Sequence, residues 1–347
     1  MEVSGSTAGP LRVIGELSGI RHPEPLDAYR GELVALIGLL LADGVDALEV
    51  TRIVGNLNDA LTTRLIGLAE AELGPPPCRH AWLALGSQGR GEQVLSSDQD
   101  SALAYDGIGV EPDEVRDYFG PLAGLVVAAL ARAGLALCRG GYMASTWQHP
   151  IDEYRRLFRG WVDAPEPAAL LRAEIFLDLR PVHGDLPVDV LDAVLASGAM
   201  QPRFLVMLAR AAVTFRPPIG MFGRLRVENS AIDIKRSGIA AIVLLARLYA
   251  LAAGSSARTT ALRLDAAAAA GWIARTRAAN LIEAYRFLTD LRLRHQLEQA
   301  RRGEPTDNVV PLAALTAQEQ RRLREVLRAV RDLQDMTAAR FATDTVM

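Results

Sequence analysis

Two short apolar runs interrupt a chain whose residue pattern is otherwise mostly helical. Ala81–Leu85 ends at a glycine, and Ser101–Tyr105 is bounded by Asp106-Gly107, so both runs predict buried strands. Glu114–Ala133 has a helical pattern closed by glycine, and Leu135–Ala144 is predicted to return as a further strand. The order of strand, loop, strand, helix and strand predicts a small mixed-sheet core, which makes the expected fold class α+β.

Helical segments are predicted on both sides of this core. Upstream, a first helix is predicted at roughly Asp27–Ala42, and Gly44 separates it from a second helix that runs to about Leu73. The second helix stops at Gly74 and three consecutive prolines, which break a helix. Downstream, only Arg224–Arg236 interrupts the helical pattern, because its residues alternate around Asn229-Ser230 and predict a β-hairpin. The later helices are expected at Gly238–Ala253, Thr259–Ala270, Arg275–Arg301 and Thr316–Thr337. The chain is thereby divided into an N-terminal helical segment (1–75), the core (76–200) and a C-terminal helical domain (201–347).

Composition excludes several classes of protein. The 347 residues are 50% hydrophobic with a net charge of -3, which excludes disorder along the whole chain and a global positive field for non-specific nucleic-acid or membrane binding. Cys78 and Cys138 lie far apart with no CxxC or Cys/His companions, so neither a disulfide framework nor a zinc site of the usual spacing is expected. No signal-peptide pattern opens the chain, and its apolar stretches are too short or too charged to span a bilayer. A soluble, cytoplasmic protein is the expectation.

The stretch between the two predicted strands carries the chemistry. Leu85–Asp100 reads LGSQGRGEQVLSSDQD. Its glycine spacing is neither the G-x-G-x-x-G of a dinucleotide site nor the Gly-Lys-Ser/Thr ending of a P-loop. A strand that ends in Gly86-Ser87 lets the backbone approach a ligand closely and aim N–H groups at phosphate oxygens. Arg90, three residues later, is placed to add a charge-assisted contact to a phosphate.

Asp98 and Asp100 stand two residues apart, immediately before the second apolar run. On a strand their carboxylates would project from one face about 7 Å apart, and they would repel each other unless a cation lay between them. Magnesium, which prefers hard oxygen ligands and is shared with substrate phosphates, is the expected ion. The alternative is structural: Ser96-Ser97-Asp98 forms a helix N-cap, and the glycine-rich loop is ordinary polar surface. The combination of strand, Gly-Ser turn, arginine and acid pair favours the metal site.

The motif resembles a known superfamily. Gly86-Ser87 followed by Asp98-x-Asp100 is similar to the signature of the polymerase-β-type nucleotidyltransferases. The longer string GSQGRGEQVLSSDQDSAL resembles bacterial nucleotidyltransferases related to the N-terminal part of protein-PII uridylyltransferase. Asn58–Thr62 and Phe176–Asp185 also resemble segments of that family. Ile232–Lys235 with Gly238-Ile239, and Arg292–Gln296, resemble its C-terminal substrate-binding domain. The resemblance therefore covers about residues 25 to 340.

The resemblance implies transfer of NMP from an NTP, UTP or ATP, to an acceptor hydroxyl, with a protein as the expected acceptor. By this resemblance Asp98 and Asp100 bind the magnesium ions, and Gly86 and Ser87 hold the β- and γ-phosphates with help from Arg90. The metals would stabilise both the entering and the leaving oxygens. Lys235, the chain's only lysine, is the remaining nucleotide-binding candidate, as a charge that meets the triphosphate; the alternative is a solvated charge at a strand end.

One departure from the family pattern concerns the third carboxylate, which the superfamily commonly carries on a later strand. Leu135–Ala144 contains no acid, and Asp178 is the substitute chosen for a catalytic role, with Glu174 and Asp185 as others. A structural bridge from Asp178 to Arg180 is the competing interpretation. The missing acid keeps two other functions open: a catalytically silent nucleotide-binding regulator and a helical protein-interaction module.

Four polar residues are interpreted as surface positions rather than as parts of a site. Arg292, His295 and Gln299 share one face of a predicted helix by their spacing, and a solvated polar face is favoured over a role in a cleft. His183 is interpreted as surface polarity in a loop rather than as an acid/base group.

Overall fold

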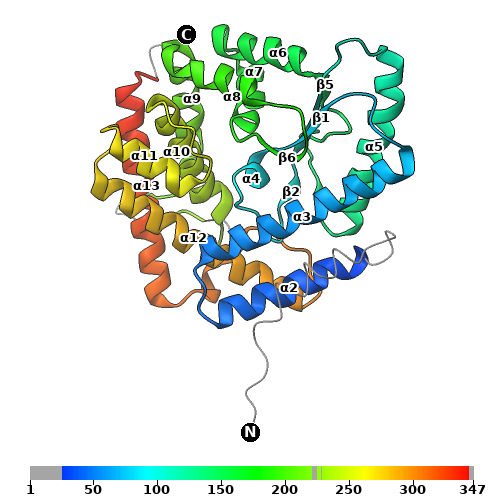
Figure 1. Cartoon of the computed structure of the whole chain (residues 1–347). Coiled ribbons are helices and arrows are strands. Elements are labelled where there is room, and N and C mark those ends of the chain that lie inside the picture. The colour runs from blue at the N-terminus through cyan, green and yellow to red at the C-terminus, as the bar shows by residue number, and fades with distance from the viewer. Residues whose placement is uncertain (1–25, 221–224, 228, 344–347) are drawn as a thin grey trace. The chain divides into compact units, whose positions relative to one another are not determined.

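The computed structural model describes residues 26–220, 225–227 and 229–343. It divides into two compact units. The first holds the described residues up to Tyr154 with Asp178–Val188 and Ala300–Gly303, and the second holds Arg155–Leu177, Asp189–Gln299 and the residues from Glu304 onward. Figure 1 shows the elements of both. The division at 75 and 200 stays a prediction.

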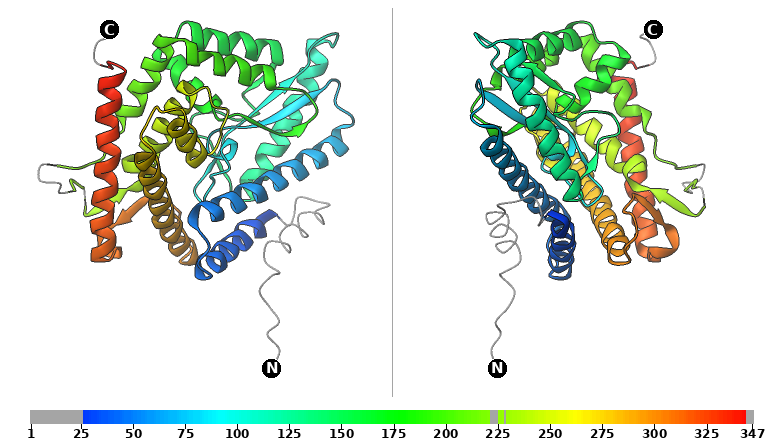
Figure 2. Two further views of the ribbon diagram at one scale, coloured as in Figure 1. Left: turned by 60° about the vertical axis from the view of Figure 1, so that its left-hand side comes forward. Right: turned by 90° about the vertical axis from the view of Figure 1, so that its right-hand side faces the viewer.

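Two long helices open the first unit. α2 (Leu26–Ala42) lies alongside α3 (Ala47–Leu73), as both views of Figure 2 show. α3 begins at Asp46, whose carboxylate accepts a 3.0 Å hydrogen bond from the Leu48 N–H, as an N-cap residue does. Leu57, Leu61 and Leu65 of α3 are buried, so the leucine spacing marks the packed face. Both predicted helices are confirmed.

A four-stranded mixed sheet forms the centre of the first unit, in the order β5-β3-β1-β6. β1 (His80–Ala84) is antiparallel to both β3 (Ser101–Tyr105) and β6 (Arg180–Gly184), and β3 is parallel to β5 (Gln148–Pro150). β1 is buried along its whole length, as expected of a central strand, and α5 (Pro112–Arg132) connects β3 to the elements that follow. A small mixed sheet within a mainly helical chain confirms the α+β class in outline.

The strand predicted at Leu135–Ala144 is wrong for most of its length. Only β4 (Ala136–Leu137) is extended, and it pairs in parallel with β2 (Asp98–Gln99) in a separate two-stranded sheet. Turns follow because Gly141 has a positive φ of 74° and donates its N–H to the Cys138 carbonyl. The strand beside β3 is instead β5, ten residues downstream, and it carries no acid.

The second unit is mainly helical. The β-structure there is β7 (Ala231–Asp233), antiparallel to β8 (Val309–Pro311). The four helices expected downstream are confirmed within a few residues at each end. The helical elements are α6 (Ile151–Asp163), α7 (Pro167–Phe176), α8 (Asp189–Ser197), η1 (Gly198–Met200), α9 (Pro202–Thr214), the π-helical turn η3 (Lys235–Ile239), α10 (Ala240–Ala252), α11 (Thr260–Ala269), α12 (Arg275–Arg301), η4 (Leu312–Ala314) and α13 (Ala317–Arg340).

The hairpin predicted at Arg224–Arg236 is wrong in its pairing. β7 takes β8 as its partner, with Ile232 opposite Val310, and both of these side chains are buried. Leu225 instead forms an isolated bridge to Ile219, and residues 224 and 228 lie outside the described part of the chain. Pairing with β8 places the buried, β-branched Ile232 and Val310 opposite each other. A hairpin with the segment at Leu225 would pair β7 with a half-exposed side chain that is not β-branched.

No single helix in the described ranges is both long and apolar enough to cross a membrane. The bent pair Asp189–Met200 and Pro202–Thr214, which meet at 91°, passes that test by length and composition.

Candidate functional site

The Gly-Ser motif forms a single helical turn at the end of β1. α4 (Gly86–Gly89) starts directly after Leu85, and the N–H groups of Gly89 and Arg90 return to the carbonyls of Leu85 and Gly86 at 2.9 and 3.1 Å. The N–H groups that open a helical turn have no acceptor within it. The end of β1 therefore presents backbone donors, as a loop that binds phosphate must.

Asp98 and Asp100 flank the point where the chain leaves one sheet for another. Asp98 belongs to β2, whereas β3 begins at Ser101, so the two acids do not share one continuous strand as expected. Between them Gln99 is buried and donates to the carbonyl of Leu135 at 2.9 Å. Asp98 and Asp100 are both half-exposed. This alternation places the two acids on the face opposite Gln99, as the two-residue spacing predicts.

Asp100 lies against the Gly-Ser turn. The Leu85 N–H donates to the Asp100 carbonyl at 2.9 Å. A Cβ atom on Gly86, which has a φ of 51°, would lie 2.6 Å from Oδ2 of Asp100. Glycine is required here because a side chain would displace the carboxylate. The turn and the second acid of the motif therefore belong to one site.

The surroundings of the two carboxylates differ. Burial raises the pKa of the Cys138 thiol to about 11, and the thiol donates a hydrogen bond to Asp100, whose charge raises that pKa further. Within the described residues, no side-chain hydrogen bond or ion pair engages the carboxylate of Asp98. Two half-exposed carboxylates on one face, next to backbone donors, supply the hard oxygen ligands that magnesium prefers. The residues present therefore fit such an ion.

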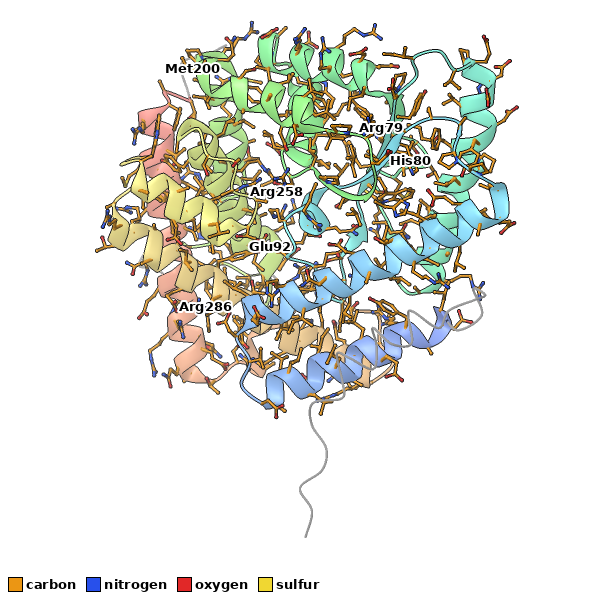
Figure 3. The ribbon with its side chains drawn as sticks, in the orientation of Figure 1. Arg79, His80, Glu92, Met200, Arg258 and Arg286 are labelled. Carbon is orange, nitrogen blue, oxygen red and sulfur yellow. The ribbon has the colours of Figure 1, made fainter. Side chains whose placement is uncertain are left out.

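Arg90 is held by two acids. Its guanidinium pairs with Oδ2 of Asp178 and, at 2.6 Å, with Oε2 of Glu92, which is labelled in Figure 3. The exposed fraction of the side chain is 11% for Arg90, 6% for Glu92 and 0% for Asp178. A buried carboxylate is stable only when it is paired, so Arg90 is the counter-ion of Asp178. This geometry brings two of the predicted site residues together.

The predicted bridge from Asp178 to Arg180 is wrong. Arg180 turns to α3 and pairs with Oδ2 of Asp59 at 2.6 Å, while its guanidinium also donates to the carbonyl of Gln88 at 3.0 Å. The Gln88 side-chain amide donates to the other Asp59 oxygen at 3.1 Å. Asp178 precedes β6, whereas Arg180 is the first residue of that strand, so the two side chains do not share a strand face. Asp59, Gln88 and Arg180 thus fasten α4 to α3 and β6.

Glycines allow the loop to pack this closely. A Cβ on Gly89 would lie 1.9 Å from the carbonyl oxygen of Asp178, and one on Gly55 would lie 3.2 Å from Cα of Gly91. Sequence reasoning singled out neither contact. Asn58–Thr62 was noted only for its resemblance to the family. In the structure, the side-chain amide of Asn58 in α3 donates a 3.0 Å hydrogen bond to Gln93 of the loop.

Lys235 lies in the second unit, where it is exposed at the start of the π-helical turn η3. It follows β7 rather than lying on it, so it does not share a strand face with Asp233. Asp233 instead caps the turn by accepting a 2.9 Å hydrogen bond from the Arg236 N–H. The nucleotide-binding role of Lys235 stays a prediction.

The solvated face predicted for α12 is also wrong. Arg292 and Gln299 are buried. Arg292 donates to Oδ1 of Asn308 at 2.6 Å, and Gln299 accepts from the Asp307 N–H at 2.9 Å. His295 contacts Asp307 at 2.9 Å. These side chains hold the segment that leads into β8.

The second unit also contains a cavity of about 230 Å³. Arg247, Arg258 and Arg263 line it, and Arg258, labelled in Figure 3, pairs with Asp192 at 2.8 Å. These residues come from separate helices and a loop, so no sequence motif joins them.

Comparison with known proteins finds similarity to nucleotidyltransferases in two parts of the chain. Residues 31–168 match the family described as Putative nucleotidyltransferase DUF294, and residues 202–341 match the Putative nucleotidyltransferase substrate binding domain. A bifunctional glutamine synthetase adenylyltransferase/adenylyl-removing enzyme of Streptomyces coelicolor is 28% identical over 313 residues, which is 79% of this chain. The chain covers 29% of that protein's length.

Proposed function

Because the chain belongs to the DUF294 nucleotidyltransferase family, we propose that it transfers NMP from an NTP to a hydroxyl of an acceptor. The observation that carries the proposal is the convergence of Asp100 with the turn at Gly86, beside Asp98 on the same face. A metal-bound polyphosphate needs both parts: carboxylate oxygens for the ion and backbone donors for the phosphates.

In this proposal Asp98 and Asp100 hold magnesium, which when bound neutralises charge on the triphosphate and on the leaving pyrophosphate. Gly86 and Ser87 present backbone N–H groups to the β- and γ-phosphates. The acceptor oxygen attacks the α-phosphorus, the bond from that phosphorus to the bridging oxygen breaks, and pyrophosphate leaves with the electron pair. The proton of the hydroxyl passes to solvent water, because Asp178, the acid predicted for a catalytic role, is fully buried.

The burial of Asp178 supports a positioning role for this residue instead of a role as the base. Its carboxylate is fully buried against Arg90, so we propose that it acts through this arginine. Arg90 directly follows α4, and its main chain closes the turn on Gly86. Asp178 is then a positioning residue that fixes the phosphate-binding turn through Arg90, whose charge is balanced by Asp178 and Glu92.

The nucleotide is proposed to be ATP or UTP, and the acceptor a protein. The adenylyltransferase in the relative's name favours adenylyl transfer, and glutamine synthetase in that name favours a protein acceptor. The family likeness to uridylyltransferases keeps UTP as the alternative. The arginine-lined cavity, of which most lining residues fall within the part that matches the substrate binding domain, is the proposed contact for the acceptor.

The test is transfer of label from α-labelled ATP, UTP, GTP or CTP to proteins of a cell extract, with pyrophosphate measured in parallel. Wild type with magnesium is expected to label an acceptor with one nucleotide and to release pyrophosphate in equal amount. The variant Asp98→Asn with Asp100→Asn is expected to abolish both. Metal-dependent NTP binding without product would instead indicate a silent regulator, and absence of NTP binding would leave an interaction module.

A further inference from the structure

Three metal-ligating side chains meet at the far end of the central strand from the phosphate-binding turn. They are Glu70 near the end of α3, His80 at the start of β1 and His183 in β6, and their ligating atoms all lie within 4.8 Å of one another. Nε2 of His183 lies 3.2 Å from Oε1 of Glu70, and Nε2 of His80 lies 3.3 Å from that same oxygen. The expectation that His183 is a polar surface residue in a loop is therefore wrong.

The fold explains why these three residues meet. α3 ends at Gly74, and the proline run returns the chain to β1 within a few residues of Glu70. β6 pairs with β1 so that His183 lies opposite Trp82, and a Cβ on Gly184 would lie only 2.1 Å from the His80 carbonyl oxygen. This close approach of the two backbones leaves the imidazole rings 5.9 Å apart between centroids.

His80 has a buried ring nitrogen that forms no hydrogen bond with the described residues. Its residue is 4% exposed, and its buried Nε2 has no hydrogen-bond partner among the described residues. Oε1 of Glu70 lies 3.3 Å from this nitrogen but forms no hydrogen bond with it. A buried polar atom without a partner costs free energy, so such an atom in a native fold calls for an explanation. A cation between the three side chains would satisfy all of their ligating atoms at once.

The donor set and its spacing indicate which cation fits. Two imidazole nitrogens and one carboxylate oxygen are the ligands of many zinc sites, whereas magnesium prefers oxygen alone. Zinc bonds of about 2.0–2.1 Å in a tetrahedron separate neighbouring ligand atoms by roughly 3.3 Å. The two contacts of Glu70 Oε1, 3.2 and 3.3 Å, match that separation.

We propose that Glu70, His80 and His183 form a zinc site that joins α3, β1 and β6, with water as the fourth ligand. His80, labelled in Figure 3, opens β1, while Gly86 follows the end of the strand, so roughly 20 Å of extended chain separates this site from the phosphate-binding turn. The site does not depend on the proposed transfer reaction.

The test uses the full chain stripped of metal with dipicolinate and titrated with zinc chloride by calorimetry. One zinc per chain is expected, with a higher melting temperature in the wild type that Glu70→Gln does not show. Cobalt(II) in place of zinc is expected to give the strong visible absorption of a tetrahedral site. Glu70→Gln and His183→Gln, at half-buried positions, and His80→Gln are each expected to weaken zinc binding at least ~100-fold and to abolish that absorption.

The matched control is His149→Gln. His149 also contacts a glutamate, Glu153, at 3.5 Å, but belongs to no three-residue metal-ligating cluster in the described part of the chain, so wild-type zinc affinity is expected. The proposal is overturned if the folded wild type, checked by circular dichroism, binds no zinc. It is also overturned if Glu70→Gln and His183→Gln bind zinc as the wild type does, since His183 would then only form a hydrogen bond with Glu70.

Discussion

Single residues set the geometry of the phosphate-binding turn. Gly89 allows α4 to lie against the carbonyl of Asp178, Gly86 leaves room for the carboxylate of Asp100, and Arg90 neutralises a buried acid. The sequence predicted that Gly86, Asp98 and Asp100 form one site because Gly86 ends one predicted strand and the two acids stand just before the next. It could not predict the partner of Arg90, which lies 88 residues away and is fixed only by tertiary packing.

Gly89→Ala is expected to lower the free energy of unfolding by about 1–3 kcal/mol or more, because its Cβ would overlap the Asp178 carbonyl oxygen. Gly67→Ala is the control: this glycine lies inside α3 with nothing within 4 Å of the added Cβ, and alanine there is expected to stabilise by about 0.5–1 kcal/mol. Urea denaturation measures both. Equal effects of the two substitutions would contradict the close packing at Gly89.

Arg90→Gln is expected to destabilise the protein by about 3–5 kcal/mol, because it leaves the buried Asp178 carboxylate without its cation. Arg116→Gln removes an exposed pair with Asp113 and is expected to cost less than about 1 kcal/mol. Chemical denaturation compares the two variants. An Arg90 variant with wild-type stability and only a raised KM for NTP would show that Arg90 binds phosphate without supporting the fold.

Elements with a strong local signal were predictable, and those defined by a distant partner were not. The leucine spacing of α3 predicts that helix and its packed face without any distant partner. β7 was predicted to lie in a hairpin because its true partner, β8, begins 76 residues after Asp233 ends β7, beyond α10, α11 and α12. The strand predicted at Leu135–Ala144 is wrong after β4 because turns such as the one at Gly141 end the extended chain, and β5 was not predicted.

The start of α13 carries a pH-dependent contribution to stability. Partial burial acts to raise the pKa of Glu319, but hydrogen bonds from Thr316 and Arg294 outweigh it and lower that pKa. A carboxyl with a lowered folded-state pKa stabilises the fold above its unfolded pKa of about 4.3, and this stability is lost as the pH falls through the folded value.

Glu319→Gln is therefore expected to cost about 1 kcal/mol at pH 7 and progressively less below about pH 4, where the wild-type carboxyl becomes protonated. Glu325→Gln, on an exposed position of the same helix, is the control and is expected to be neutral at both pH values. Denaturation at pH 7 and pH 3.5 gives the comparison. A cost that does not change with pH would contradict the role of the charged carboxylate.

At the scale of the whole molecule, the two units are interleaved along the chain. Arg155–Leu177 belongs to the second unit although it precedes the β6 strand of the first. In it Phe158 packs on Trp161 and Phe176, with ring centroids 4.8 and 5.3 Å apart. The sequence showed that a mixed core is joined to a helical region, but the alternation of segments between the units has no local signal.

A fragment that ends at residue 200 is consequently expected to fold poorly, because it retains Arg155–Leu177 but lacks α9, against which α7 packs. Exposed aromatic surface should then bind a hydrophobic dye such as ANS far more strongly than the full chain does. Dye fluorescence and gel filtration measure this. A monomeric, dye-negative fragment would show that the first 200 residues form an independent domain.

The central claim is that Asp98 and Asp100, together with the turn at Gly86, hold a metal-bound nucleoside triphosphate. Calorimetric titration with ATP and with UTP, with magnesium and with EDTA, tests it most directly. Binding of at least one nucleotide is expected only with magnesium, at least ~10-fold weaker in Asp98→Asn and Asp100→Asn, and unchanged in Asp106→Asn, an acid at the other end of β3. Equal binding with EDTA, or wild-type affinity in both variants of the acid pair, would contradict the account.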